Sequence, residues 1–495
     1  MKTFKEIKKL LHVATFFTLM VCAVVLTPSC SDDETVVEEK VNEITKYKTP
    51  KYIFYFIGDG MANPQINLAE AALNNTGFRL KSSSIGVGDM NISKFEVAGM
   101  ATTYAQDRYI TGSAAAATAL ATGEKTTINT ISKNGDRTRN IETLAEMARD
   151  KGMRVGIVSS VSIDHATPAC FYAHVNERKE YYNIASQMAS SKFDYFGGGY
   201  AKGNFPSKGD GDILEKMKGA GYAIATTREE LAAVKSGNKC WAYNHKTDRD
   251  GALLYEIDRP ADCLSLTEFT KKGIELLDNE NGFFLMVEAG KVDWACHAND
   301  AVSATHNMIE FDNAIGEAIA FYNAHPEETL IVLTGDHECG GLSIGFAGTG
   351  YENMFDLLKC QKLSYEAFTY KVKSWQPNTS FENALDSVEL YFGLRNTTID
   401  ETLALSSSET QRLKTAFDLS MTDEKGDIYG GYDPFTLTIT HILNNKAGLA
   451  WTSFKHTGVP VPVMAMGQGQ YEFSGYYDNT DIAKKIMKVG ALKVD

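Results

Sequence analysis

Six short apolar runs, each about the length of one strand, constrain the fold of this chain most strongly. They cover residues 51–57, 154–158, 193–196, 283–287, 330–333 and 461–466. Runs without polar alternation indicate strands buried on both faces, as in a parallel sheet. Helical patterns lie between them, including residues 141–151, 184–189 and 299–323. We therefore predict an α/β fold with a doubly wound, mostly parallel sheet flanked by helices.

Polar residues follow the carboxyl ends of several of these runs. In chain order they are Asp59, Asp164-His165, Glu288 and Asp336-His337. Ligands of doubly wound sheets bind in the crevice beyond the carboxyl ends of the strands. The sequence therefore predicts a polar site at this edge of the sheet.

The alternation of buried strands and helices stops between about residues 346 and 448. Helical segments occur around 351–363, 381–392 and 409–420, and no clear buried strand lies among them. We interpret this stretch as a helical insertion before the last predicted strand, 461–466. It could cover the site or build a subunit interface.

The N-terminus has the pattern of a targeting segment. Four lysines precede the apolar residues 10–26, which end in Leu26-Thr27-Pro28-Ser29-Cys30, a loose match to a bacterial lipobox. The alternative is an ordinary signal peptide cleaved elsewhere. We expect residues 1–29 to be a lipoprotein signal peptide, with a lipid on Cys30 that anchors the chain to a membrane. A polar tether over 30–48 and one domain over 49–495 follow, in an exported protein of the cell envelope, facing the periplasm or the outer surface.

The overall charge limits the possible partners. A net charge of −14 argues against a nucleic-acid-binding surface, which needs a basic face. It does not exclude an anionic substrate, because local cations can capture phosphate inside an acidic protein.

Ser113 stands between Gly112 and an alanine-rich run that strongly favours a helix. Gly112 would allow a sharp turn there. Ser113 would then lie at a helix N-terminus, where unpaired N–H groups and the helix dipole favour an anion. Taken alone, a serine before such a run is typical of a simple helix N-cap.

Several potential metal ligands accompany this serine. Asp293 and His297 are four residues apart, a spacing that can place both on one helix face. Alone they could be a solvated aspartate and an unrelated histidine. The adjacent Asp336-His337, with His456 and Asp59, adds the carboxylates and imidazoles that zinc takes in open, catalytic sites.

Further residues extend the set toward phosphate chemistry. Glu288 and Thr167 offer oxygen atoms suited to magnesium. Arg178 offers a planar fork that matches two phosphate oxygens. Two metals close together can hold the attacking and leaving oxygens of an in-line displacement. A serine, metal ligands and an arginine together point to phosphoryl transfer.

At this level of detail the sequence resembles the alkaline phosphatases, over essentially everything after the tether. The motifs occur in family order: Ile57-Gly-Asp-Gly-Met61, Gly112-Ser-Ala-Ala-Ala-Ala-Thr118, His165-Ala-Thr-Pro-Ala169 with Ala173-His-Val-Asn-Glu-Arg178, Val287-Glu288, Asp293-x3-His297, Thr334-Gly-Asp-His337 and His456-Thr-Gly458.

The resemblance implies roles for these residues. Ser113 would be the nucleophile that becomes phosphorylated, and Arg178 would bind the nonbridging phosphate oxygens. Two Zn²⁺ and one Mg²⁺ would be the cofactors. Asp293, His297 and His456 would bind the first zinc, which activates water. Asp336, His337 and Asp59 would bind the second zinc. Asp59 would also bridge to the magnesium ion, whose other protein ligands would be Thr167 and Glu288. The substrates would be small phosphate monoesters, and we also expect a homodimer.

The sequence departs from the family pattern at three positions. Many members carry aspartate where Gly112 stands, so Arg178 would be less restrained here. His165 and Trp294 occupy positions at which the best-known bacterial members have aspartate and lysine, which suggests altered magnesium retention. His165 could also approach the third metal and favour zinc.

Other chemistries on the same scaffold remain open. A sulfatase would need a Cys/Ser-x-Pro-x-Arg setting, which is absent around Ser113. A phosphodiesterase would be distinguished by comparing rates on a monoester and a diester of the same phenol. A third interpretation is a surface protein that binds phosphate without catalysing a reaction. The intact set of metal ligands argues against it.

Overall fold

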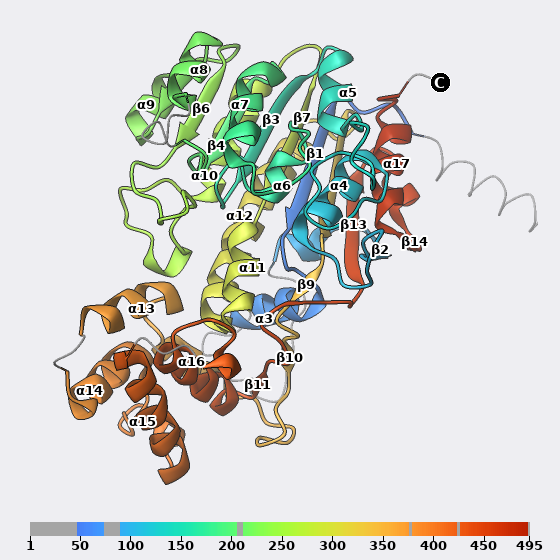
Figure 1. Ribbon diagram of the computed structural model, residues 1–495. Coiled ribbons are helices and arrows are strands. Elements are labelled where there is room, and N and C mark those ends of the chain that lie inside the picture. The colour runs from blue at the N-terminus through green and yellow to red at the C-terminus, as the bar shows by residue number, and fades with distance from the viewer. Residues whose placement is uncertain (1–46, 74–89, 205–210, 376–378, 423–425, 494–495) are drawn as a thin grey trace, which may run out of the picture. The chain divides into compact units, whose positions relative to one another are not determined.

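The computed structural model describes residues 47–73, 90–204, 211–375, 379–422 and 426–493 (Figure 1). The expected signal peptide over 1–29 and nearly all of the tether lie outside these residues. From Lys48 onward the described residues form one compact unit. Its centre is a ten-stranded sheet with the order β14-β2-β13-β8-β1-β7-β3-β4-β6-β5. Only β13 runs antiparallel to its neighbours, so the predicted mostly parallel sheet is confirmed.

The strands of this sheet are short. They are β1 (Tyr52–Gly58), β2 (Val97–Thr102), β3 (Arg154–Ser159), β4 (Tyr195–Gly198), β5 (Ala223–Ala225), β6 (Cys240–Tyr243), β7 (Phe283–Glu288), β8 (Thr329–Gly335), β13 (Val461–Gly467) and β14 (Gly475–Asp478). Two-residue strands pair outside it: β9 (Glu338–Cys339) with β12 (His456–Thr457), and β10 (Ser343–Ile344) with β11 (Leu449–Ala450).

Helices cover both faces of the sheet (Figure 1). The main ones before the insertion are α3 (Asn63–Leu73), α4 (Ser113–Thr122), α5 (Leu144–Asp150), α6 (Ala166–Ala169), α7 (Tyr181–Ser191), α8 (Ile213–Gly219), α9 (Arg228–Ala233), α10 (Leu266–Leu277), α11 (Gly290–His297) and α12 (Ala301–Ala324). Helix α17 (Asn479–Val489) follows β14. Alternate side chains of β1 face opposite layers, because Phe56 packs on Phe311 of α12 while Tyr55 packs on Phe171. This two-sided burial explains the unbroken apolar run of β1.

All six predicted runs form strands of the sheet, but four further strands were not predicted. Strands β5 and β6 lie at one edge of the sheet, and β2 and β14 at the other. In β2 and β14 most residues are exposed or only partly buried, so neither shows a continuous apolar run. The run expected to be the last strand, β13, is in fact followed by β14.

The insertion is helical, as predicted. Helices α13 (Tyr365–Ser374), α14 (Phe381–Phe392), α15 (Ser407–Thr422) and α16 (Pro434–Lys446) pack around a core of their own. They are drawn in orange and brown in Figure 1. The predicted segments did not include α13 and α16. Among the described residues, no helix combines the length and the apolar character needed to cross a bilayer.

Candidate active site

The carboxyl ends of four adjacent strands bring the predicted acidic residues together. Asp59 follows β1, Glu288 ends β7, and Asp336 follows β8. The next strand, β3, leads into the turn that carries His165 and into α6, which carries Thr167. Because β8, β1, β7 and β3 are neighbours in the sheet, these side chains converge on one edge.

The first cluster contains Asp293, His297 and His456. In helix α11, His297 Nε2 lies 3.3 Å from Asp293 Oδ2, and His456 Nε2 lies 3.5 Å from Asp293 Oδ1. The four-residue spacing therefore does place Asp293 and His297 on one face. Backbone carbonyls hold the other ring nitrogens: Phe454 O is 2.6 Å from His297 Nδ1, and Thr111 O is 2.9 Å from His456 Nδ1. These contacts leave both Nε2 atoms facing Asp293, the arrangement of oriented metal ligands.

The second cluster lies beside the first and contains Asp59, Asp336 and His337. All three side chains are fully buried, and His337 Nε2 lies 3.4 Å from Asp59 Oδ1 and 3.3 Å from Asp336 Oδ2. The His337 and His456 rings stack with centroids 3.6 Å apart, so the two clusters are in direct contact.

A third group gathers Asp59, His165 and Glu288, whose potential ligand atoms lie within 4.8 Å of one another. The Thr167 hydroxyl is also buried nearby, and Ser159 donates a short hydrogen bond to the second Glu288 oxygen. Asp59 thus faces both the second and the third group, as a bridging ligand would.

The donor set fits divalent cations because so many buried polar atoms here have no hydrogen-bond partner. These atoms are both Asp59 oxygens, Glu288 Oε1, Asp293 Oδ1, Asp336 Oδ2, Thr167 Oγ1, His165 Nδ1 and both His337 nitrogens. Burial and repulsion between carboxylates raise the pKa of Asp59 and of Asp336 well above their usual range. Burial likewise raises the pKa of Glu288 to about 7. Burying so many polar and acidic groups together is unfavourable in free energy unless positive charge compensates for them. Bound cations would supply that charge.

Ser113 is the first residue of α4, at the helix N-terminus as predicted, and it is almost fully buried. No side chain caps this helix, so its first N–H groups have no side-chain partner at the end where Ser113 lines a cavity. The predicted reason for Gly112 was wrong. Its φ of −123° and ψ of 160° suit any residue, so no sharp turn requires a glycine. A Cβ there would meet only Ile128 Cδ1, at an ordinary contact distance of 3.7 Å, so the backbone leaves room for one.

Arg178 reaches the same cavity and completes its cationic side. The cavity measures about 390 Å³ and is lined by Ser113, Arg178, His165, Trp294 and ligands of the first cluster. Arg178 Nη2 lies 2.9 Å from His165 Nε2, and the Trp294 ring meets the His165 ring edge-on, with centroids 5.5 Å apart. Burial and the Arg178 charge lower the pKa of His165 well below its usual value, so the imidazole is neutral. It can therefore accept the Arg178 N–H.

One potential ligand of the site was missed from the sequence, and one residue predicted to lie at the site is structural. The Cys339 thiol lies with Asp293, His297 and His456 in one potential ligand group, and it was not among the predicted ligands. The signal in the sequence was its position two residues after His337, whereas its pairing opposite His456 in β9–β12 is seen only in the structure. Asp164, in contrast, is structural: its carboxylate accepts the backbone N–H groups of Lys202 and Gly203.

Comparison with known proteins agrees with this geometry. The model of the alkaline phosphatase family matches residues 50–492. The chain belongs to the alkaline phosphatase family. Alkaline phosphatase 3 of Bacillus subtilis is 34% identical over 401 residues, covering 79% of each chain. Enzymes of this family are phosphoric monoester hydrolases.

Solved alkaline phosphatases share the fold. The cold-active alkaline phosphatase of a psychrophilic Shewanella species superposes with a TM-score of 0.74 at 29% identity, covering 89% of this chain and 99% of that one. The alkaline phosphatase TAB5 has been solved as a variant with glutamate in place of a histidine and with magnesium in a site called M3. Its TM-score is 0.62 at 25% identity, covering 91% of this chain and all of the other.

Proposed function

We propose that this chain hydrolyses phosphate monoesters to inorganic phosphate and an alcohol, through a phosphoserine formed at Ser113. The observation that carries the proposal is that three ligand groups, linked through Asp293 and Asp59, lie beside a cavity lined by Ser113, Arg178 and ligands of the first cluster. The proposed ligands are Asp293, His297 and His456 for one Zn²⁺, and Asp59, Asp336 and His337 for a second. Glu288 and Thr167, with Asp59, would hold Mg²⁺.

The residues of the chain have different roles in the proposed reaction. Arg178 and the uncapped N–H groups of α4 bind the nonbridging oxygens and place phosphorus in line with Ser113 Oγ. Ser113 Oγ forms a bond to phosphorus while the bond to the alcohol oxygen breaks. Water then attacks the phosphoserine, which releases phosphate and restores the hydroxyl. Bound divalent cations would supply the positive charge that favours the Ser113 alkoxide, water as the nucleophile and the leaving oxygen.

A direct test is to trap the intermediate. Rapid quenching of the enzyme with a phosphate monoester in acid should leave phosphate on the peptide that contains Ser113, detected by mass spectrometry. Phosphate on a different residue would contradict the proposed nucleophile.

Gly112 provides a first prediction about phosphate affinity. Because a Cβ at this position would have no close contact, we expect Gly112→Asp to be accommodated and its carboxylate to restrain the nearby Arg178. We expect inorganic phosphate to inhibit the variant about threefold more tightly or better, the scale of a partly exposed charge pair. The uncharged Gly112→Asn is the matched control. Unchanged phosphate inhibition in Gly112→Asp would refute the idea.

His165 provides a second prediction, about the third metal. The magnesium seen in a TAB5 variant with glutamate for histidine suggests that a carboxylate favours magnesium in this fold. His165 faces Asp59 and Glu288, so His165→Asp should supply a hard oxygen ligand to that group. We expect more magnesium per chain and less zinc than in the parent. Equal metal contents by elemental analysis would count against it.

Export and lipid anchoring are also proposals. We propose that the chain is a lipoprotein of the cell envelope, held by a lipid on Cys30, and that it functions as a homodimer. Cys30→Ser should then shift phosphatase activity from the membrane fraction to the soluble fraction of the producing cells. Activity that stays with the membranes would contradict the anchor, and sedimentation of the purified enzyme tests the dimer.

A further inference from the structure

Lys291 is a buried cation that the proposed reaction does not use. It lies in α11, between Glu288 and Asp293 in the sequence, and its side chain is fully buried. Lysine is rarely buried to this degree unless its charge is paired. Its Nζ lies 2.8 Å from Asp248 Oδ2, and the Asp248 side chain is only 3% exposed. The second Asp248 oxygen accepts the N–H groups of Asp250 and Ala252, both at 2.9 Å, which fixes the carboxylate.

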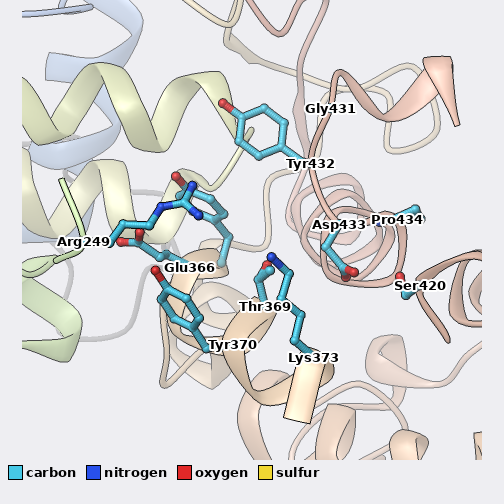
Figure 2. Close-up of a pocket in the computed structure, with 11 residues that line it drawn as sticks. Arg249, Glu366, Thr369, Tyr370, Lys373, Ser420, Gly431, Tyr432, Asp433 and Pro434 are labelled. Atoms are coloured by element: carbon cyan, nitrogen blue, oxygen red, sulfur yellow. The ribbon is translucent and has the colours of Figure 1, made fainter. Parts of the chain in front are cut away.

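Two aromatic rings and a second carboxylate complete the surroundings of Lys291. Its Nζ is 3.9 Å from the centre of the Tyr255 ring and 4.7 Å from that of Trp294. Glu366 Oε2, from α13 of the insertion, lies 3.6 Å away. Figure 2 shows Glu366 beside Arg249 at the wall of a separate hollow of about 190 Å³. The insertion therefore contributes one of the charges around Lys291.

The contacts continue from Lys291 into the catalytic cavity. A cation within about 6 Å of an indole face is attracted to it, more strongly where water is excluded. The Trp294 ring that Lys291 contacts also meets the His165 ring edge-on. His165 Nε2 in turn faces Arg178 Nη2 at 2.9 Å. Each link is a direct contact, and the last residue is the proposed phosphate ligand.

We propose that Lys291, anchored by Asp248, is a positioning residue for phosphate binding. Its ammonium group holds the Trp294 ring, which supports His165, and His165 orients the Arg178 guanidinium. The inference rests on the proposed role of Arg178. A purely structural ion pair would instead stabilise the fold without affecting phosphate affinity.

A double-mutant cycle in the zinc- and magnesium-loaded enzyme separates these two roles. We expect Lys291→Met to raise the inhibition constant of inorganic phosphate roughly 3- to 30-fold, the range of a desolvated cation–π contact. In an Arg178→Ser background the same change should alter that constant less than about twofold, because coupled residues are not additive. Lys291→Arg keeps the charge and should retain most of the affinity. Metal content and thermal midpoint are measured for every variant.

Lys272 of α10 supplies the matched control. It is another nearly buried lysine, which donates to Val234 O and Glu275 Oε1 instead of to residues of the site. Lys272→Met should lower the thermal midpoint and leave phosphate inhibition unchanged. If Lys291→Met does not yield folded protein, Trp294→Leu tests the next link, with the same lack of additivity expected.

The outcomes are distinct. An unchanged phosphate constant in Lys291→Met, or an equal loss with and without Arg178, would overturn the positioning role while leaving the proposed function intact. A normal phosphate constant in Arg178→Ser alone would instead refute the proposed phosphate ligand, and the positioning role with it.

Discussion

Replacing Ser113 with alanine is expected to lower kcat for phosphate monoesters by at least about 10³-fold, because the proposed covalent route needs this hydroxyl. The fold should tolerate the change, since Ser113 opens a helix that continues with four alanines. Metal content and thermal midpoint should therefore match those of the parent. The measurement is steady-state hydrolysis of an aryl phosphate by fully metal-loaded enzyme.

Thr122→Ala is the matched control for this variant. Thr122 is a buried hydroxyl residue of the same helix, and it donates only to the Thr118 carbonyl. Its loss should leave kcat within about twofold, as for a neutral change away from the site. A Ser113→Ala enzyme with more than a tenth of the parent activity would show that Ser113 is not the nucleophile.

Removing the metals should have the second large effect. A chelator is expected to abolish hydrolysis, and zinc together with magnesium should restore it. The metal-free protein should also unfold at a lower temperature, because ligands that bind only the folded state stabilise it. In that form Asp59 and Asp336 would be buried beside other carboxylates without compensating charge.

Metal affinity should also depend on pH in a predictable direction. The pKa values of Asp59 and Asp336 are raised by burial and by neighbouring carboxylates, and that of Glu288 is raised to about 7. Because their pKa values are raised, these groups keep their protons to higher pH than usual, and metal binding must release those protons. Apparent zinc affinity should therefore fall as pH falls, by about tenfold per pH unit for each proton released. Calorimetric zinc titration at pH 6 and pH 8 measures the change.

In the chelation experiment, activity that survives verified removal of the ions would contradict the metal-dependent account.

The sequence predicted the centre of the fold better than its edges. Strands β1, β7 and β8 are buried on both faces, so their apolar runs are continuous and easily recognised. Strand β14 has no such run, because it forms an edge and Tyr476 is 65% exposed. Its pairing with β2, far away in the sequence, leaves no local signal.

The site was predicted in part from local patterns and in part only through the family resemblance. The spacing of Asp293 and His297 on α11 was a local signal. The approach of His456 to Asp293 joins positions 163 residues apart in the sequence, so no periodicity could reveal it. Lys291 was overlooked because lysine in a sequence is usually taken for a surface residue, and only the fold shows that Asp248 and two rings enclose it.

The most direct test of the central claim is to locate the metals themselves. In crystals of the zinc- and magnesium-loaded enzyme, diffraction on both sides of the zinc absorption edge should show two zinc peaks. One should lie among Asp293, His297 and His456, and the other among Asp59, Asp336 and His337. Zinc bound elsewhere, or no zinc between these side chains, would contradict the proposed assembly of the site around Ser113.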